Sequence, residues 1–292
     1  MQTKIKSSGD GSDAEKGLVV ERRFTSADQD PFESFDWIDM DVEIRNPDGS
    51  MADSIEGVKL PSGFSGIPGK VCAQKYLRKA GVPKHLRNVP EDGIPIWLQR
   101  SEPDHERLQS IDAAERMGGE TDGRQLFRRL AGTWTYWGWK YGYFASEADA
   151  RAYFDEMCYL IASQRSAPNS PQWFNTGLHW AYGIEGPAQG HSFVDPDTGE
   201  LGKSTNAYEH PQPHACFIQS VSDSLVGGTD SIMGLWNREA LLFKYGSGTG
   251  SNFSNIRGRG EPLSGGGTSS GLLSFLKIGD RAAGAIKSGG TT

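Results

Sequence analysis

Cys216 is the main candidate in this sequence for a residue that takes part in chemistry. It lies in the apolar stretch HACFIQSV. A cysteine in such a stretch is usually a small buried hydrophobic residue. The alternative is a redox thiol that faces a substrate cleft, which requires a second cysteine as its partner. The two other cysteines, Cys72 and Cys158, lie in segments that we expect to be helical, and nothing in the sequence pairs either with Cys216. We expect both to be structural thiols.

The number and spacing of the cysteines limit other kinds of site. Three widely separated cysteines suggest no disulfide framework. Because no CxxC pair occurs, we expect no closed zinc site and no metal ligands within this chain.

Four loop segments have a composition that suits a phosphorylated ligand. Glycine lets backbone N–H groups approach an anion closely, and serine and threonine add hydroxyl donors. None of the four is a Walker A loop, because no GK[ST] follows. Each alone is typical of an ordinary turn, but together they favour a nucleotide or phosphate site. The segments are Asn169-Ser170-Pro171, GSGTG at 246–250, GGGTSSG at 265–271 and SGGTT at 288–292.

Composition and charge narrow the class of protein. The 292 residues suffice for one or two domains with a real core. A net charge of -7 gives no reason to expect nucleic-acid binding, although it does not exclude a local basic pocket. The polar amino terminus has no apolar signal-peptide core, and no apolar run approaches the roughly 20 residues that span a membrane. We therefore expect no membrane partner and a cytoplasmic location.

The amino-terminal elements are expected to be irregular. Residues 1–22 are predicted to be a disordered head, and residues 23–122 an extended, wrapping region. Within that region, short strands flank the turn signal at 46–49. A short helix is predicted over 70–80, ended by Gly81 and Pro83, before the proline-rich segment 84–122.

Residues 123–182 are predicted to form a helical domain. A first helix over 123–142 is dense in aromatic residues, which is typical of packing rather than of a cofactor cage. The next helix has Ser146 as its N-cap and Asp149 three residues later, followed by apolar residues at helical spacing. A polar insertion follows at 183–212.

Residues 213–292 are predicted to begin an α/β layer or barrel. HACFIQSV is typical of a buried strand, and residues 230–245 of a helix with Thr229 as N-cap and Gly246 as C-cap. GSNFSNIRG is expected to return as a strand before a helix in GLLSFLKIGDRAAGAIK. Strand, helix, strand and helix give an α/β fold, but too few strands to close a sheet.

The ordered set of these segments is specific to one family. NSPQWFNTG, PHACFIQSVSDSL, KYGSGTGSNFSNIRG, GGGTSSGLLSFLK and AIKSGGTT resemble, in order, segments of the catalytic subunit of ribonucleotide reductases. RRLAGTWTYWGWKYGYF and the opening RFTSADQDPFESFDWIDMDVEIRNPDGS resemble the vitamin B12-dependent, class II subgroup, so that the likeness runs from Arg23 to Thr292. It implies an α/β fold with a mainly helical amino-terminal domain and then the first part of a ten-stranded α/β barrel.

The resemblance implies substrate-binding roles for four residues. Ser170 matches the hydroxyl residue that contacts the substrate phosphate. Ala215 and Cys216 match the pair beside the substrate, with Cys216 as one half of the redox couple that supplies electrons to the ribose. Gly248 matches the glycine that lines the substrate.

The resemblance also implies an allosteric site for a deoxynucleotide effector. Asp223, Ser224 and Leu225 match the stretch that binds the effector, and Arg257 matches a ligand of its phosphate. The segment 288–292 is similar to the start of the second specificity loop, which reports effector identity to the substrate site.

For the complete enzyme, the family implies reduction of ribonucleoside diphosphates to DNA precursors. Its cofactor is adenosylcobalamin, and its reductant is a thioredoxin-type protein. The chain lacks the family's Asn-x-Cys-x-Glu pattern with the radical cysteine, and SGFSGIPG at 62–69 is richer in glycine and proline than expected. We therefore expect the isolated fragment to be inactive. Its expected partner is a second copy in a homodimer or a complementary C-terminal polypeptide. The alternatives are another reductase class, a non-catalytic nucleotide-binding fragment and an unstable fragment.

Overall fold

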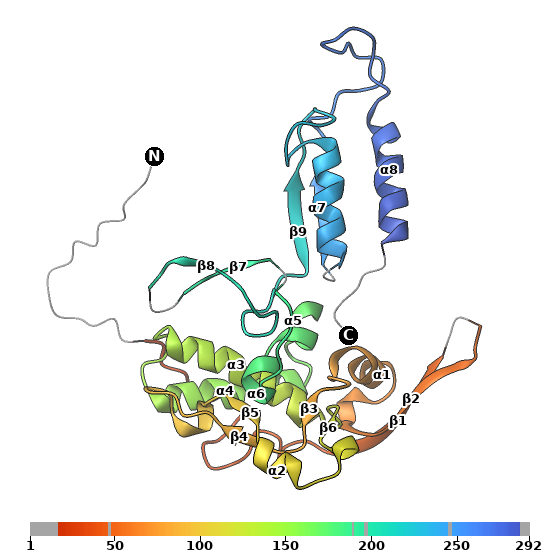
Figure 1. Cartoon of the computed structure of the whole chain (residues 1–292). Coiled ribbons are helices and arrows are strands. Elements are labelled where there is room, and N and C mark those ends of the chain that lie inside the picture. The colour runs from red at the N-terminus through yellow and green to blue at the C-terminus, as the bar shows by residue number, and fades with distance from the viewer. Residues whose placement is uncertain (1–16, 46–47, 189, 196–197, 245–246, 287–292) are drawn as a thin grey trace, which may run out of the picture.

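The computed structural model describes residues 17–45, 48–188, 190–195, 198–244 and 247–286. The segment 288–292, Gly246 and most of the head therefore lie outside the described residues. In Figure 1 a rounded body contains α1 to α6, and a taller unit built from β9, α7, β10 and α8 stands above it. No helix among the described residues is long and apolar enough to cross a membrane.

The end of the head is bound to the body. We expected residues 1–22 to be disordered, but Leu18 donates to the Tyr143 carbonyl (2.7 Å) and accepts from the Ala145 amide (3.0 Å). Arg22 Nη1 forms a 2.7 Å ion pair with Asp155 Oδ2. The prediction is therefore wrong for residues 17–22, because this less polar end of the head is held to the body by backbone pairing and by one ion pair.

A hairpin follows, as the turn signal predicted. The antiparallel strands β1 (Trp37–Arg45) and β2 (Met51–Pro61) pair Ile38 with Leu60 and Met40 with Val58. Val58 and Leu60 are fully buried, because side chains alternate between the two faces of a strand.

The helix predicted over 70–80 begins and ends earlier. A 3-10 turn η1 (Ser62–Phe64) leads to α1 (Ile67–Val71), in which Pro68 occupies the first turn, a position that tolerates its missing N–H. The π-helical turn η2 (Cys72–Tyr76) follows and ends at Leu77, whose backbone is extended.

The segment 84–122 is made of short pieces, which lie along the lower side of the body in Figure 1. The strands β3 and β6 pair antiparallel, as do β4 and β5. The pieces are β3 (Val82–Pro83), β4 (Leu86–Asn88), η3 (Ile96–Leu98), β5 (Ser101–Pro103), α2 (His105–Gln109), η4 (Ala113–Glu115) and β6 (Met117–Gly118).

Two packed helices form the centre of the body. α3 (Gly123–Lys140) begins with a capping box between Asp122 and Gln125. α4 (Glu147–Ala162) begins where predicted, because the Ser146 hydroxyl accepts from the Asp149 amide. The core between them and the hairpin includes Val42, Val58, Leu60, Phe64, Leu126, Phe127, Leu130, Cys158, Ile161 and Trp173.

Two short helices and a hairpin connect the body to the upper unit. α5 (Ser170–Asn175) and α6 (Leu178–Tyr182) complete the predicted helical segment. The polar insertion contains the antiparallel strands β7 (Ser192–Val194) and β8 (Leu201–Lys203).

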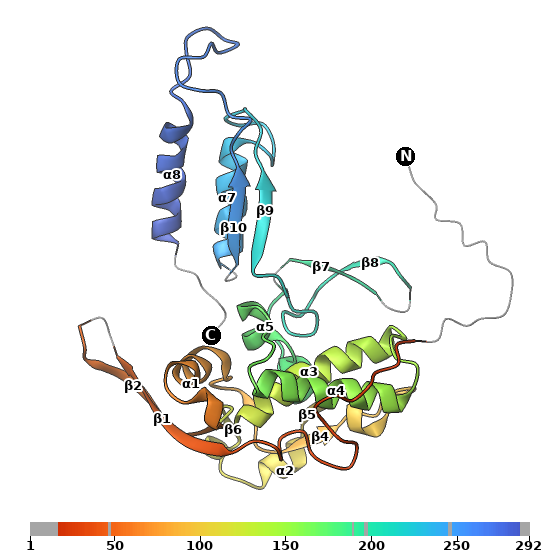
Figure 2. The ribbon, with the colours of Figure 1, turned by 180° about the vertical axis from the view of Figure 1, so that it is seen from behind.

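The upper unit has the predicted order of strand, helix, strand and helix, which confirms the α/β fold class. The strands β9 (Cys216–Ser220) and β10 (Gly248–Asn252) pair in parallel, with α7 (Ile232–Lys244) as the crossover and α8 (Leu272–Ala285) packed beside it (Figure 2). The sheets formed by the described residues have two strands each, so none of them closes a barrel.

Two details of this unit differ from the prediction. The Ser231 hydroxyl, not that of Thr229, accepts from the Gly234 amide (3.1 Å) and caps α7. β9 was expected to be buried, but the Ile218 side chain on it is 88% exposed. The described residues leave one face of the two-stranded sheet uncovered, whereas α7 and α8 pack on the other side around Leu235 and Trp236.

Candidate functional site

Three of the predicted substrate residues meet at the start of the parallel pair. Cys216 and Gly248 are direct register partners, and the Gly248 amide donates to the Ala215 carbonyl at 2.6 Å. A Cβ atom at Gly248 would lie 3.5 Å from Cys216 Sγ, which is ordinary contact. Glycine is therefore not required for packing, but it leaves uncovered a thiol that a methyl group would cover.

The surroundings of the three thiols separate Cys216 from the others. Cys72 and Cys158 are buried, as expected for structural residues, whereas Cys216 is exposed. Burial raises the pKa of Cys72 to about 12 and raises that of Cys158 as well. Because the thiolate is the reactive form, Cys216 is the thiol that the structure makes available for chemistry.

Side chains from α7 and from the preceding loop hold the start of β10. Ser247 Oγ donates to the His214 carbonyl at 3.1 Å, and Thr249 Oγ1 donates to Glu239 Oε1 at 2.8 Å. These bonds fix residues on both sides of Gly248. The register between Cys216 and Gly248 is thereby tied to the crossover helix.

Ser170 lies on a different part of the fold. It is the first residue of α5, it is exposed, and its hydroxyl is 3.4 Å from the Tyr76 hydroxyl. In both ribbon views α5 lies below the end of β9 at which Cys216 begins the strand (Figures 1 and 2). The helix that Ser170 begins thus lies on the side of the body that faces the upper unit.

The predicted effector residues are brought together by an ion pair. Arg257 donates from Nε to Asp223 Oδ2 (2.6 Å) and from its amide to Oδ1 (3.2 Å). These bonds hold the pKa of Asp223 below its usual value. The Ser224 and Leu225 carbonyls accept from the first turn of α7, at the Ile232 and Met233 amides (2.9 and 3.1 Å). Ser224 and Leu225 therefore lie at the start of α7, and Asp223, which pairs with Arg257, directly precedes them in the chain.

The glycine-rich segment 265–271 forms one loop with residues 260–263, to which it is hydrogen-bonded. The Ser269 amide donates to the Glu261 carbonyl (2.8 Å), and the Gly271 amide donates to Ser269 Oγ (3.0 Å). These two amides are therefore already bonded within the loop. The loop geometry does not add support to a phosphate cradle at this segment.

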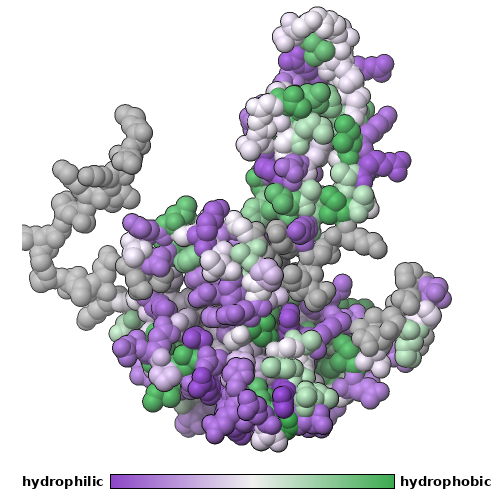
Figure 3. Space-filling view, in the orientation of Figure 1, coloured by the Kyte–Doolittle hydropathy of each residue, from purple (hydrophilic) through white to green (hydrophobic). Residues whose placement is uncertain are grey.

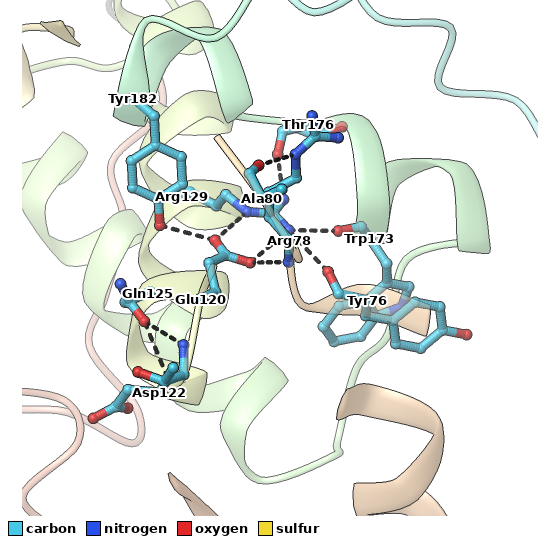
Figure 4. A network of polar contacts seen from close by, with 11 residues as sticks. Tyr76, Arg78, Ala80, Glu120, Asp122, Gln125, Arg129, Trp173, Thr176 and Tyr182 are labelled. Atoms are coloured by element: carbon cyan, nitrogen blue, oxygen red, sulfur yellow. Dashed lines mark hydrogen bonds and ion pairs between the residues drawn. The ribbon is translucent and has the colours of Figure 1, made fainter. Parts of the chain in front are cut away.

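A buried network that sequence reasoning missed lies under α5 (Figure 4). Arg129 and Glu120 are fully buried and form a two-point ion pair, Nε to Oε1 at 2.7 Å and Nη2 to Oε2 at 3.2 Å. Tyr182 also donates to Glu120 Oε1, at 2.8 Å. The one sequence signal was an arginine on the apolar face of α3, between Leu126 and Leu130.

A cavity of about 1300 Å³ separates α3 and α6 from the polar insertion. Aromatic side chains of α3 that we expected to be packing residues line it, including Tyr136 and Trp137, together with His179 and His210. Burial lowers the pKa of both histidines. The cavity reaches His214, two residues before Cys216.

The described residues do not by themselves fit a corrinoid cofactor. The corrin ring supplies the ligands of its own cobalt, so a protein must enclose the ring rather than provide a cluster of metal ligands. The exposed face of β9 beside Cys216 provides no such enclosure among the described residues.

Comparisons with known proteins agree with this architecture. Residues 39–164 match the family model described as class II vitamin B12-dependent ribonucleotide reductase, and residues 214–292 match the ribonucleotide reductase barrel domain. Relatives named vitamin B12-dependent ribonucleotide reductase occur in Agrobacterium fabrum (63% identical), Bradyrhizobium diazoefficiens (61%) and Rhodopirellula baltica (35%). The alignments cover 94% of this chain but only 22%, 22% and 23% of those relatives, so the chain spans less than a quarter of their length. The chain belongs to the family of class II vitamin B12-dependent ribonucleotide reductases.

Proposed function

We propose that the protein to which this chain contributes reduces ribonucleoside diphosphates to 2′-deoxyribonucleoside diphosphates and so supplies DNA precursors. The observation that carries the proposal is the exposed Cys216 thiol beside Ala215 and Gly248, in a chain of this family. Adenosylcobalamin, when bound, supplies the radical that starts the reaction in this family.

In this proposal Cys216 supplies one half of the reducing equivalents. Cys216 and a second thiol, contributed from outside this chain, are oxidised to a disulfide as the ribose C2′–OH bond is replaced by C2′–H. The hydroxyl leaves as water, so two thiols and one ribonucleotide give a disulfide, a deoxyribonucleotide and water. A thioredoxin-type protein then reduces the disulfide by thiol exchange.

The other site residues have supporting roles. Ser170 contacts a phosphate of the substrate, while Ala215 and Gly248 provide the small surface against which the ribose lies. The exposure of Ser170 and the uncovered thiol beside Gly248 support these roles.

A deoxynucleotide effector binds beside the start of α7 in this proposal. Asp223, Ser224 and Leu225 contact it, and Arg257 binds its phosphate. Their clustering through the Asp223–Arg257 ion pair supports a single site. A phosphate at Arg257 must compete with the Asp223 carboxylate, so effector binding and this ion pair oppose each other.

The remaining organisation follows from the family. Residues 23–122 wrap the helical domain at 123–182, and residues 213–292 contribute to the catalytic barrel. The protein works in the cytoplasm, as a homodimer or with a complementary C-terminal polypeptide.

The test is an assay of the full-length protein with adenosylcobalamin, a ribonucleoside diphosphate and excess dithiol. Cys216→Ser is expected to lower multiple-turnover reduction at least a hundredfold, because serine cannot enter a disulfide. Cys72→Ala is the control, since burial keeps Cys72 out of the chemistry. Sustained turnover by the Cys216 variant would exclude the redox role, and no reduction by the unaltered protein would exclude the proposed activity.

A further inference from the structure

The hydroxyl of Ser170 has a neighbour from a distant part of the chain. Tyr76 Oη lies 3.4 Å from Ser170 Oγ, although 94 residues separate the two. The Tyr76 ring stacks on Trp173, with centroids 5.0 Å apart and planes 12° from parallel. Because Trp173 is buried in α5, the stack holds the phenol ring along that helix with its hydroxyl at the Ser170 end.

An unusual turn places the Tyr76 backbone. Tyr76 ends the π-helical turn η2, in which the Leu77 amide donates to the Cys72 carbonyl at 3.1 Å, five residues back. Cys72 and Ala73 anchor this turn in the core. Single π-helical turns inside helices are often found at functional sites, because the wider turn redirects a side chain.

The buried Arg129 guanidinium binds both segments that bear the two hydroxyls, η2 with Tyr76 and α5 with Ser170. Arg129 Nη2 donates to the Tyr76 carbonyl (3.1 Å) and to the Trp173 carbonyl (2.9 Å), as Figure 4 shows. Its Nη1 donates to the Thr176 carbonyl at 2.6 Å, at the end of α5. Because Glu120 fixes the guanidinium at two points, the end of η2 and α5 are held at a set separation.

We propose that Tyr76 is a second phosphate-contacting residue of the substrate site, acting as a pair with Ser170. This inference rests on the proposed function, in which Ser170 contacts the substrate phosphate. Two hydroxyl donors this close can reach different oxygens of one phosphate group. Each such bond has a charged acceptor, and hydrogen bonds to charged groups are stronger than neutral ones.

The test is the Tyr76→Phe variant of the full-length protein, which keeps the ring and its stack on Trp173 but removes the hydroxyl. The KM for a ribonucleoside diphosphate is expected to rise about tenfold to a hundredfold, as for loss of a hydrogen bond to a charged group. The kcat should change less than about threefold, because the lost hydrogen bond stabilises the bound substrate and the transition state to the same extent. Binding of the unphosphorylated ribonucleoside should not change. Tyr143→Phe, an exposed tyrosine beyond the end of α3, is the matched control.

The variant Ser170→Ala and the double variant of Ser170 and Tyr76 distinguish failure of this inference from failure of the proposed function. If Ser170→Ala raises the KM and Tyr76→Phe does not, the inference on Tyr76 is overturned while the proposed function stands. If both variants raise it, the double variant should cost less than the two single effects combined, since the hydroxyls share one phosphate. An equal loss of nucleoside binding in Tyr76→Phe would show a merely structural role and overturn the inference. If the unaltered protein reduces no ribonucleotide, the inference and the proposed function fail together.

Discussion

Three cysteines of the same chain have different environments, and the environment of each sets its reactivity. Cys72 and Cys158 pack in the core beneath the hairpin, where a thiolate is poorly solvated. Cys216 lies at the exposed start of β9. At the scale of the single residue, burial therefore separates two packing thiols from one available for chemistry.

Alkylation of the folded 292-residue chain should therefore be selective. At pH 8 iodoacetamide is expected to modify Cys216 within minutes and to leave Cys72 unmodified. With a pKa of about 12, about one Cys72 thiol in ten thousand is ionised at that pH. Mass spectrometry of the intact chain should show one adduct, three after unfolding, and none in folded Cys216→Ser. Modification of Cys72 or Cys158 at the rate of Cys216 would contradict the burial described here.

The join between α5 and α6 depends on a single glycine. Gly177 has a φ of +85°, and a Cβ there would lie 2.4 Å from the Arg129 carbonyl oxygen. The chain thus approaches the backbone of α3 as closely as two backbones allow. This contact fixes α5, and with it Ser170, on the surface of the body.

Replacing this glycine should disturb the whole element. Gly177→Ala is expected to destabilise the chain by clearly more than the roughly 1–2 kcal/mol that a left-handed conformation costs. Gly142→Ala is the control, because Gly142 has a φ of +67° and open space around its Cβ position. Urea unfolding followed by circular dichroism gives both values. Equal destabilisation of the two variants would show that the close contact with α3 does not affect the free energy of unfolding.

At the scale of the whole molecule, the body and the upper unit are unequally stabilised. α3 and α4 are packed on several sides, whereas β9 and β10 form a two-stranded sheet with an open face. A two-stranded sheet depends for its stability on what packs against it, and here helices cover one side only. The upper unit also exposes apolar side chains, among them Ile218, Leu241 and Leu273, and hydrophobic surface is visible on this unit in Figure 3.

Hydrogen exchange should reveal this inequality. In the 292-residue chain, amides of residues 126–135 are expected to exchange at least about a hundredfold more slowly than those of residues 216–220, because the sheet opens locally at lower cost. Mass spectrometry of peptides after timed labelling measures both. Equal protection of the two segments would show that the upper unit is as stable as the body.

Local signals explain why much of this fold could be predicted. The hairpin of β1 and β2, the Ser146 cap and the crossover order of the upper unit each depend on neighbours in the sequence, and each was found. The α7 cap failed by two residues, because Thr229 and Ser231 are both acceptable caps and only the packed helix selects one.

Long-range contacts explain what could not be predicted. The exposure of β9 depends on which surfaces cover it, and the sequence of the strand itself carries no such information. The residues of the candidate site likewise divide into those that a local sequence motif indicates and those that depend on long-range contacts. Ala215, Cys216 and Gly248 were proposed from the resemblance, whereas the Tyr76–Ser170 pair and the bonds from Arg129 to Tyr76, Trp173 and Thr176 join residues 44 to 94 positions apart.

The partners of Arg129 also impose an order on the folding of the chain during its synthesis. The ribosome makes Tyr76 and Glu120 before Arg129, but Trp173 and Thr176, which accept its remaining bonds, come more than 40 residues later. A cation buried with incomplete partners is strongly unfavourable. The nascent body therefore cannot close over Arg129 until α5 has emerged, and the shortest nascent chain able to complete it must extend past Thr176.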